Sequence, residues 1–495
     1  MNNINNDVIT RDQNGKPFSR FMIVAIMLIG GFFTMLNETV LATAFPKLMS
    51  YFSVNASTIQ WLTSAFLMTN GIVIPLSAWL TTRINTKWLY QTAMILFLIG
   101  TCVAYVSTSF GELLVARIIQ AIATGISFPL FQTIMLRIFP ASHRGAALGL
   151  AGLVVGLSPA IGPTLSGWII DNYTWRDLFG INIIPLAIVT LLGFYFLKPL
   201  LPTRKSSLDF WSLILSCFGF GLILYGFSSV GNDGWGSLTV IASLVVGIII
   251  AALFVWRDTS VDDPLLNLKV FRSYKFDLGT LIGSLAMMSM VGFEMVLPLY
   301  LQTMHGDSAL ESGLTLLPGA LMLGIFAPVT GQIFDKFGAR NLSISGFLLL
   351  TIGTVPFIFI TKDTATMTVI LLYAIRNIGI ALSMMTIMTF SMNSLSDEMI
   401  TDGTSATNTV RQIAASIATA ILTSVLTNVT KDAKPGHSLL ATNPLKYKND
   451  FINAGMSGYH WAFIVSIIFC ILGLISAFLL HQHDLGFTGK RGDQA

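Results

Sequence analysis

The stretch FMIVAIMLIGGFFTMLNETVLATAFP, residues 21–46, is a long apolar run that carries a single acid, Glu38. A helix needs about 20 apolar residues to cross the ~30 Å hydrocarbon layer of a membrane. The run is too long for the core of a signal peptide, and no small-residue cleavage site follows it. We therefore expect a first spanning helix that is retained, runs to about Pro46 and holds Glu38 well inside it.

Similar apolar runs recur along the whole chain, of which 54% of the 495 residues are hydrophobic and only 11% are charged. A soluble protein of this length needs more charge to cover its surface. The sequence therefore predicts an all-α polytopic membrane protein with fourteen spans. They are expected near 21–46, 57–81, 87–108, 111–138, 144–170, 178–197, 209–230, 237–256, 276–303, 311–334, 340–361, 366–395, 403–429 and 458–481.

Several classes of protein are excluded by the same composition. The net charge of +4 is scattered through short loops, so no nucleic-acid partner is expected. The three cysteines lie in apolar spans and have no metal-ligand spacing. No phosphate-binding loop of the GxxxxGK type and no recognisable catalytic cluster is present, so we expect no metal, no cofactor and no enzymatic activity.

Lysine and arginine in the loops predict the orientation, because cytoplasmic loops carry an excess of both. The loops on the side of the N-terminus collect most of these residues, among which we count Arg83, Arg144 and Arg411. The one basic region on the other side is the long loop at about 430–457, and long loops weigh little in this rule. Both termini are therefore expected in the cytoplasm.

Two halves of the sequence repeat each other. A short basic turn follows the second span at SAWLTTRINTK, residues 77–87, and another follows the tenth at TGQIFDKFGAR, residues 330–340. Arg117 and Arg376 lie inside the fourth and twelfth spans, and a similar offset sets Glu294 opposite Glu38. We expect two six-helix bundles in one orientation with two helices inserted between them. The predicted boundaries are 1–200, 201–265 and 266–495.

Several of these stretches resemble the major facilitator superfamily. The segment GLSPAIGPTLSGW, residues 156–168, is similar to its Gly-Pro antiporter signature, and LLVARIIQAIATG, residues 113–125, to its fourth-helix arginine motif. The segment LNETVLATAFP, residues 36–46, resembles the first-helix motif of the drug exporters. Together with WRDLFGINIIP, residues 175–185, and the fourteen spans, it makes the chain most similar to the fourteen-spanner drug:proton antiporters of the EmrB/QacA type. It implies the major facilitator fold, and it covers nearly the whole chain.

The sequence departs from the family pattern at two places. The acid of the first-helix motif usually occupies the position of Asn37, whereas here it is Glu38, about 100° further around the helix. The acid of the loop motif is replaced by Thr82 in the first half and kept as Asp335 in the second. The loop motif is otherwise carried by the basic residues Arg83, Lys336 and Arg340.

The candidate site consists of acids and their polar neighbours within the spans. A carboxylate at the bilayer centre costs roughly 2.5–3.5 kcal/mol, so Glu38 and Glu294 should face a cavity, pair with a cation or hold a proton. The alternative for each is a structural hydrogen bond or a role in helix packing. The resemblance implies that Arg117 takes part in proton coupling; the alternative is an arginine that snorkels to the surface. Asn37 and Gln120 should line the same cavity.

The fifth span should act as a seal and a flexing point, because small residues let helices approach closely and proline bends them. The residues concerned are Gly156, Pro159, Gly162, Pro163 and Gly167. Ordinary tight packing is the alternative, and both can hold.

The function that these features indicate is proton-coupled antiport, in which alternating access exports lipophilic, cationic drugs or toxic compounds. The expected partners are protons, lipophilic small molecules and the lipid bilayer. The resemblance implies a bacterial multi-pass protein of the plasma membrane that works as a monomer. Two alternatives remain: an exporter of one endogenous metabolite, lipid or peptide on the same fold, and a membrane receptor or scaffold without transport.

Overall fold

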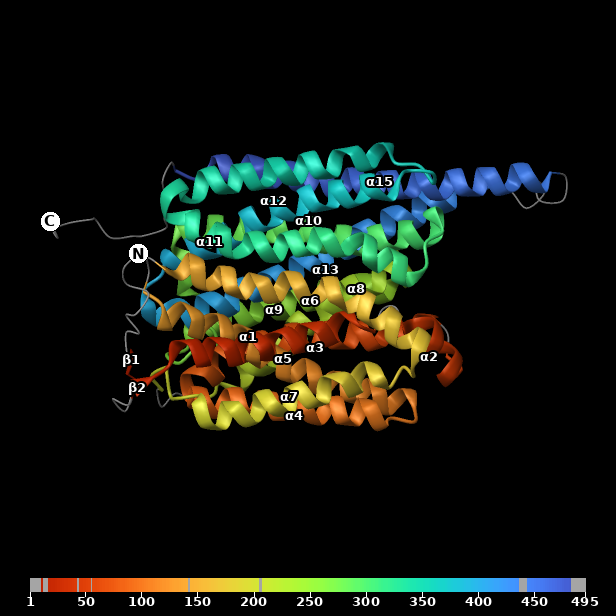
Figure 1. Ribbon diagram of the computed structural model, residues 1–495. Coiled ribbons are helices and arrows are strands. Elements are labelled where there is room, and N and C mark those ends of the chain that lie inside the picture. The colour runs from red at the N-terminus through yellow and green to blue at the C-terminus, as the bar shows by residue number, and fades with distance from the viewer. Residues whose placement is uncertain are drawn as a thin grey trace, which may run out of the picture.

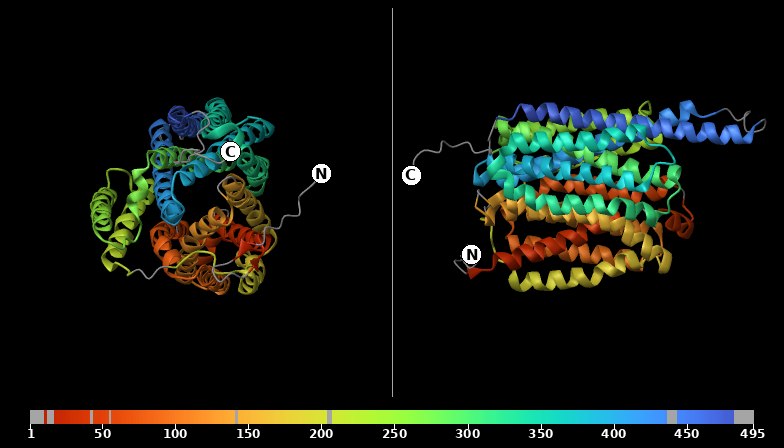
Figure 2. Two further views of the ribbon diagram at one scale, coloured as in Figure 1. Left: turned by 90° about the vertical axis from the view of Figure 1, so that its left-hand side faces the viewer. Right: turned by 45° about the horizontal axis from the view of Figure 1, so that its top comes forward.

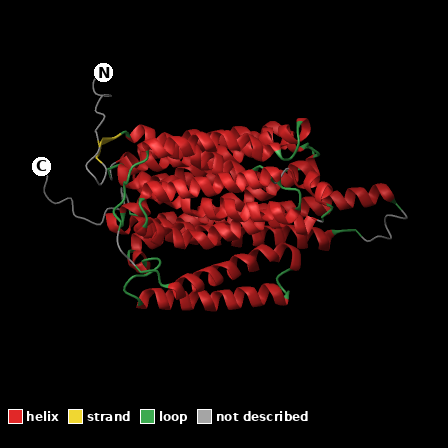
Figure 3. Ribbon diagram, turned by 90° about the horizontal axis from the view of Figure 1, so that it is seen from below, coloured by secondary structure: helices red, strands yellow, loops and turns green. Residues whose placement is uncertain are grey.

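The structure is a computed structural model that describes residues 10–11, 17–41, 44–54, 56–140, 143–203, 207–435 and 443–481. Within these residues fourteen helices are long and apolar enough to cross a membrane, as the sequence predicts. The long helices are α1 (Arg20–Thr39), α3 (Ala56–Arg83), α4 (Thr86–Val106), α5 (Phe110–Ile138), α6 (Arg144–Asn172), α7 (Asp177–Phe196), α8 (Phe210–Asp233), α9 (Leu238–Ser260), α10 (Tyr274–Tyr300), α11 (Ala309–Thr354), α12 (Thr366–Asn393), α13 (Ile400–Ala433) and α15 (Pro444–Phe478). Two residues each form β1 (Thr10–Arg11) and β2 (Pro17–Phe18), which pair antiparallel (Figure 3).

The helices form two bundles of six spans that lie side by side (Figures 1 and 2). Helices α1 and α3–α7 make the N-half, and α10–α13 with α15 make the C-half, in which α11 supplies two spans. Each half has its own apolar core. We call the end of the bundle where α1 begins and α15 ends "end A", at the left of Figure 1, and the opposite end "end B".

Helix α11 contains the turn between two spans. Its only non-helical residue is Gly338, with φ 74° and ψ 167°, a conformation that glycine adopts without a Cβ penalty. The break falls within the second basic turn of the sequence repeat. The equivalent turn of the N-half falls between Arg83, where α3 ends, and Thr86, where α4 begins.

Helix α8 lies against both halves. It packs on α3 through a hydrogen bond of 2.9 Å between Ser228 and Ser64. It packs on α13 through Trp235, whose Nε1 donates to Ser424 Oγ at 2.9 Å just beyond the end of the helix. Helix α9 covers the outer side of α8 (Figure 2, left). The insertion therefore covers the seam between α3 and α13.

An ion pair joins the two inserted helices at end A. Arg257 on α9 donates to both oxygens of Asp209, at 2.8 and 3.2 Å, and Asp209 also caps the start of α8. This hydrogen bonding holds the pKa of Asp209 below its ordinary value.

Two sequence-based expectations about helix ends are wrong. Helix α1 ends at Thr39, and a short helix, α2 (Phe45–Phe52), begins with proline in its first turn, so the apolar run does not form one helix to Pro46. Much of the expected loop at 430–457 is helical: α13 continues to Ala433, and α15 begins at Pro444. Helix α15 projects past its neighbours at end B (Figure 1).

Candidate functional site

Arg117 is fully buried where α1, α3 and α5 meet. Its Nη1 donates to Asn37 Oδ1 at 2.8 Å, to Asn37 O at 3.1 Å and to Gln120 Oε1 at 3.0 Å. Its Nε donates to Leu62 O at 3.4 Å, and its guanidinium lies over the Phe66 ring. An arginine that snorkels to the surface is therefore excluded, because its solvent exposure is 0%.

Arg376 occupies the equivalent place in the C-half. It too is fully buried, and its Nη2 donates to Ser289 O on α10. Its guanidinium lies 4.0 Å from the centre of the Phe293 ring, while its Nε and Nη1 have no hydrogen-bond partner among the described residues. The C-half arginine is thus held mainly by the face of an aromatic ring, which attracts a cation.

In both halves the arginine contacts the residue that comes just before the acid. Asn37 precedes Glu38 and accepts the hydrogen bond of Arg117; Phe293 precedes Glu294 and supplies the ring under Arg376. The acid itself is turned about 100° away around the helix. The shift of the acid from position 37 to position 38 therefore removes it from direct contact with the guanidinium.

Glu38 and Glu294 are half-buried and lie nearer to end B than to end A. Glu38 is the last but one residue of α1, roughly 27 Å from its start, and Glu294 lies roughly 30 Å from the start of α10, at 1.5 Å per residue. Charge interactions link Glu38 to Arg117 and Glu294 to Arg376. Within the described residues neither carboxylate forms an ion pair or a hydrogen bond. The expectation that Glu38 lies well inside its helix is wrong, because α1 ends one residue later.

Helix α6 is packed between the two halves. On one side, Ser158 donates to Phe32 O on α1 at 3.1 Å, and a Cβ at Gly162 would overlap Thr39 Oγ1, next to Glu38. On the other side, Gly156 and Gly167 lie against α11, where added Cβ atoms would come within 2.8 and 3.5 Å of Leu323 and Leu310. Small residues thus allow close approach to both neighbours. Pro163 is half-buried, and the side chain of Pro159 lies outside the described part of the chain.

The basic loop motif is dispersed. Arg83 is exposed at the end of α3, and Lys336 is exposed, with its ammonium 5.6 Å from the centre of the Phe337 ring. Arg340 is half-buried beyond the Gly338 break, and the side chain of Asp335 lies outside the described residues. Among the described residues Arg83 and Arg340 make no ion pair.

The two halves meet at end A through contacts that sequence patterns did not reveal. Arg144 on α6 forms an ion pair of 2.6 Å with Asp397, and Asn408 on α13 donates to Gln132 on α5 at 2.7 Å. Ser77 and Ser405 lie 3.3 Å apart across the same boundary. A shared apolar cluster surrounds these polar contacts. End A is therefore closed. The sequence counts Arg144 among the basic residues of the loops, but its partner could not be read from the sequence.

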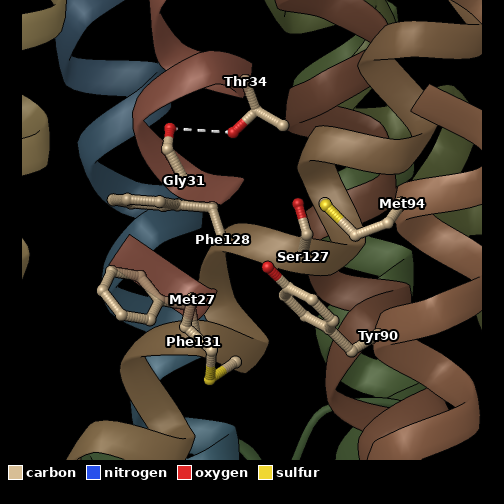
Figure 4. Close-up of a pocket in the computed structure, with 8 residues that line it drawn as sticks. All are labelled: Met27, Gly31, Thr34, Tyr90, Met94, Ser127, Phe128 and Phe131. Atoms are coloured by element: carbon tan, nitrogen blue, oxygen red, sulfur yellow. Dashed lines mark hydrogen bonds between the residues drawn. The ribbon is translucent and has the colours of Figure 1, made fainter. Parts of the chain in front are cut away.

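A small pocket lies in the N-half between α1, α4 and α5 (Figure 4). It is lined by Met27, Gly31, Thr34, Tyr90, Met94, Ser127, Phe128 and Phe131. Thr34 donates to Gly31 O at 2.9 Å within α1, so its hydroxyl is already satisfied there. The pocket lies on the end A side of Glu38 along α1, and its lining is mostly aromatic and methionine, as in sites for apolar molecules.

Comparison with known proteins identifies the family. The Major Facilitator Superfamily model matches residues 27–419. The chain belongs to the Major Facilitator Superfamily of membrane transporters. It is 43% identical to the uncharacterized MFS-type transporter YcnB of Bacillus subtilis over 94% of this chain and 96% of that protein. It is 36% identical to the lincomycin resistance protein LmrB of the same species, over 95% and 98%.

A solved structure of this superfamily has the same fold. The human organic anion transporter MFSD10 (TETRAN) matches with a TM-score of 0.59 at 14% identity, over 91% of this chain and 99% of that chain. The predicted fold, two bundles of six helices with a two-helix insertion, is confirmed, and the protein is a multi-pass membrane transporter.

An aspartate at position 37 should stabilise this transporter. The Asn37→Asp carboxylate would take the place of the amide oxygen 2.8 Å from Arg117 Nη1, and the amide nitrogen that it replaces is buried without a partner among the described residues. A hydrogen bond to a charged group is worth about 1.5–3 kcal/mol, so we expect stabilisation by roughly 1–2 kcal/mol. Thermal unfolding in detergent measures this change.

Asn182→Asp is the matched control. Asn182 is also fully buried in the N-half, but among the described residues its only hydrogen bond is to Leu178 O at 2.8 Å. A carboxylate there would face a carbonyl oxygen without a cation, so this variant should lose stability. Equal destabilisation by the two variants would contradict the assigned role of Asn37.

Proposed function

We propose that the protein is a proton-coupled antiporter that exports lipophilic, cationic compounds. The observation that carries this proposal is the repeated arrangement of one acid and one buried arginine in each half. In each case the acid lies near the guanidinium without being paired to it. Glu38 and Glu294 are the proposed proton carriers, and Arg117 is proposed to assist them.

A carboxylate that is half-buried within a bilayer-spanning helix needs compensation for its charge. A proton removes that charge, and a cationic cargo balances it, so the two compete for the same oxygens. If the carboxylate formed an ion pair with an arginine, neither the proton nor the cationic cargo could bind to it. The hydrogen bonds of Arg117 to Asn37 and Gln120 support an unlocked Glu38. Both amides are proposed to line the cavity that Glu38 faces.

Alternating access would occur by rocking of the two halves around the proposed site. The closed contacts at end A belong to one of the two end states, in which the acids would be reached from end B. We place end A in the cytoplasm because the loops there carry more lysine and arginine. Helix α6, with its Gly-Pro residues, is the proposed seal, since it contacts both halves. The unit boundaries near 200 and 265 are part of the proposal.

The proton gradient supplies enough energy for this exchange. One elementary charge that crosses 100 mV yields about 2.3 kcal/mol, to which any pH difference adds. The similarity to a lincomycin resistance protein supports drug efflux as the biological role. A bacterial plasma membrane and function as a monomer complete the proposal.

Export should depend on the proton gradient and not on ATP. In cells loaded with a fluorescent lipophilic cation, a protonophore should reduce the rate of export at least fivefold while ATP is held constant. In proteoliposomes that contain inside-out protein, an acidic lumen alone should drive uptake of the dye into the vesicles, because protons that leave the lumen exchange for dye that enters it. Export that persists after the gradient has collapsed would contradict proton coupling. Transport of only one metabolite among many tested compounds would instead favour a dedicated exporter.

A further inference from the structure

Arg411 is a further buried arginine, and its position differs from the one expected. The sequence counts it among the charges of the cytoplasmic side, but it lies within α13, roughly 16 Å from the start of that helix at 1.5 Å per residue. Its solvent exposure is 5%. The predicted orientation does not depend on Arg411, because the loops on the side of the N-terminus keep their excess of lysine and arginine without it.

The guanidinium of Arg411 has no anionic partner. Its Nη1 makes a 3.5 Å contact with Met388 Sδ, and its Nε and Nη2 are buried without any partner among the described residues. Unlike Arg117 and Arg376, it has no charge interaction with an acid among the described residues. Since arginine remains charged in proteins, this buried cation destabilises the unliganded protein.

The neighbouring helix is shaped to receive this guanidinium. Gly283 on α10 faces it, and a Cβ added there would lie 2.7 Å from Nη2. A larger residue on α10 would therefore displace the arginine. Gly283 leaves room for the guanidinium, and two of its nitrogens have no hydrogen-bond acceptor among the described residues. Together these features indicate that Arg411 binds a hydrogen-bond acceptor that is absent in this conformation.

The surroundings of Arg411 connect it to the closed contacts at end A. Asn408 lies one turn earlier on α13 and bonds to Gln132 of the other half. Ser405, one turn earlier again, contacts Ser77. Separation of the halves at end A would break both contacts and admit water and solutes to the helix face beside Arg411.

We propose that Arg411 binds an anionic or carboxylate-like group of the cargo when end A is open. The inference rests on the export function proposed above and adds to it the chemical class of cargo, which is an amphipathic cation that also carries an acidic or strongly hydrogen-bond-accepting group. Glu294 lies 11 residues beyond Gly283 on α10, roughly 16 Å along the axis, so the two ends of such a cargo would meet opposite charges.

Two dyes that differ in one group test this inference. Rhodamine 19 carries a free carboxylate, and rhodamine 6G is its ethyl ester with the same cationic ring system. Arg411→Gln should weaken the binding of rhodamine 19 to purified protein by about ten- to hundredfold, the range for a charged hydrogen bond, and change that of rhodamine 6G less than twofold. Arg411→Lys should retain part of the affinity for rhodamine 19. Gly283→Ala should weaken the binding of rhodamine 19 as Arg411→Gln does, but to a smaller extent.

Stability separates this role from a structural one. Removal of an unpaired buried charge should leave the Tm of unliganded Arg411→Gln protein unchanged or higher. A lower Tm together with equal loss of both dyes would overturn the inference. So would a wild-type protein that binds rhodamine 6G but not rhodamine 19.

Failure of both dyes to bind would count against the proposed cargo class. A labelling experiment tests separately whether position 411 becomes accessible. In a chain without Cys102, Cys217 and Cys470, Arg411→Cys should react with 2-sulfonatoethyl methanethiosulfonate from the cytoplasmic side. Ala418→Cys, two turns further along α13 and fully buried, should not react. Absence of labelling at position 411 in a protein whose Tm is unchanged or higher would overturn the inference.

Discussion

Glu38→Gln and Glu294→Gln should each reduce proton-coupled export at least tenfold, close to the level of cells that lack the protein. Glutamine keeps the size of the side chain and its capacity for hydrogen bonds but cannot hold or release a proton. The carboxylates lie beside Arg117 and Arg376 without an ion pair, so their loss should not unfold the protein. Drug flux and proton flux are measured together in proteoliposomes, and both should fall.

The chain offers two matched controls. Glu112 and Glu311 lie at the start of α5 and α11, and each completes a capping box with the preceding serine, Ser109 or Ser308. Glutamine can serve in a capping box as well, so Glu112→Gln and Glu311→Gln should keep export within twofold of the wild type. Export like that of the wild type in both Glu38→Gln and Glu294→Gln would contradict the proposed proton site.

The fold could be predicted from the sequence because the hydrocarbon layer fixes the length of every spanning helix. For this reason the span expected at 87–108 agrees within two residues at each end with helix α4, Thr86–Val106. The repeat placed Arg117 opposite Arg376 and Glu38 opposite Glu294, and in the structure each acid does lie near the arginine of its own half.

Helix ends were less predictable, because hydropathy does not record where the backbone turns. Val40 and Leu41 are apolar and fully buried, yet α1 has already ended at Thr39. At α13 the reverse holds: the polar residues Lys431 and Asp432 continue the helix beyond the expected span, which ends at 429. Amphipathic or polar turns next to a span carry no hydropathy signal that separates helix from loop.

Partners across the two halves could not be predicted at all. The pair Arg144–Asp397 is separated by 253 positions in the chain, and the pair Gln132–Asn408 by 276. The offset of the repeat relates equivalent residues, not residues in contact, so it gives no hint of either pair. Arg411 was misassigned for a related reason, since a basic residue near a span end looks the same whether it snorkels or is buried.

The glycine contact between α6 and α11 at end A should control which end of the transporter is open. Gly145 and Gly331 bring the two backbones together: a Cβ at Gly145 would lie 2.6 Å from Gly331 O, and one at Gly331 would overlap Gly145 O. Backbone atoms cannot move aside as a flexible side chain does. Gly331→Ala should therefore destabilise the closed form of end A by about 1–3 kcal/mol, and Gly331→Val by more.

This change should shift the population toward the form open at end A by roughly ten- to hundredfold and slow export by a similar factor. Ser405→Cys reports the shift, because Ser405 is 1% exposed and faces Ser77 across the closed contact. In a chain without the three native cysteines it should be labelled from the cytoplasmic side much faster when Gly331→Ala is added. Gly111→Ala is the control, since it lies in α5 with nothing within 4 Å of the added Cβ. Unchanged labelling and full export in Gly331→Ala would show that close packing of these two glycines does not set the closed state. The closed form of end A would then have to depend on the polar contacts between the halves, such as the ion pair of Arg144 with Asp397.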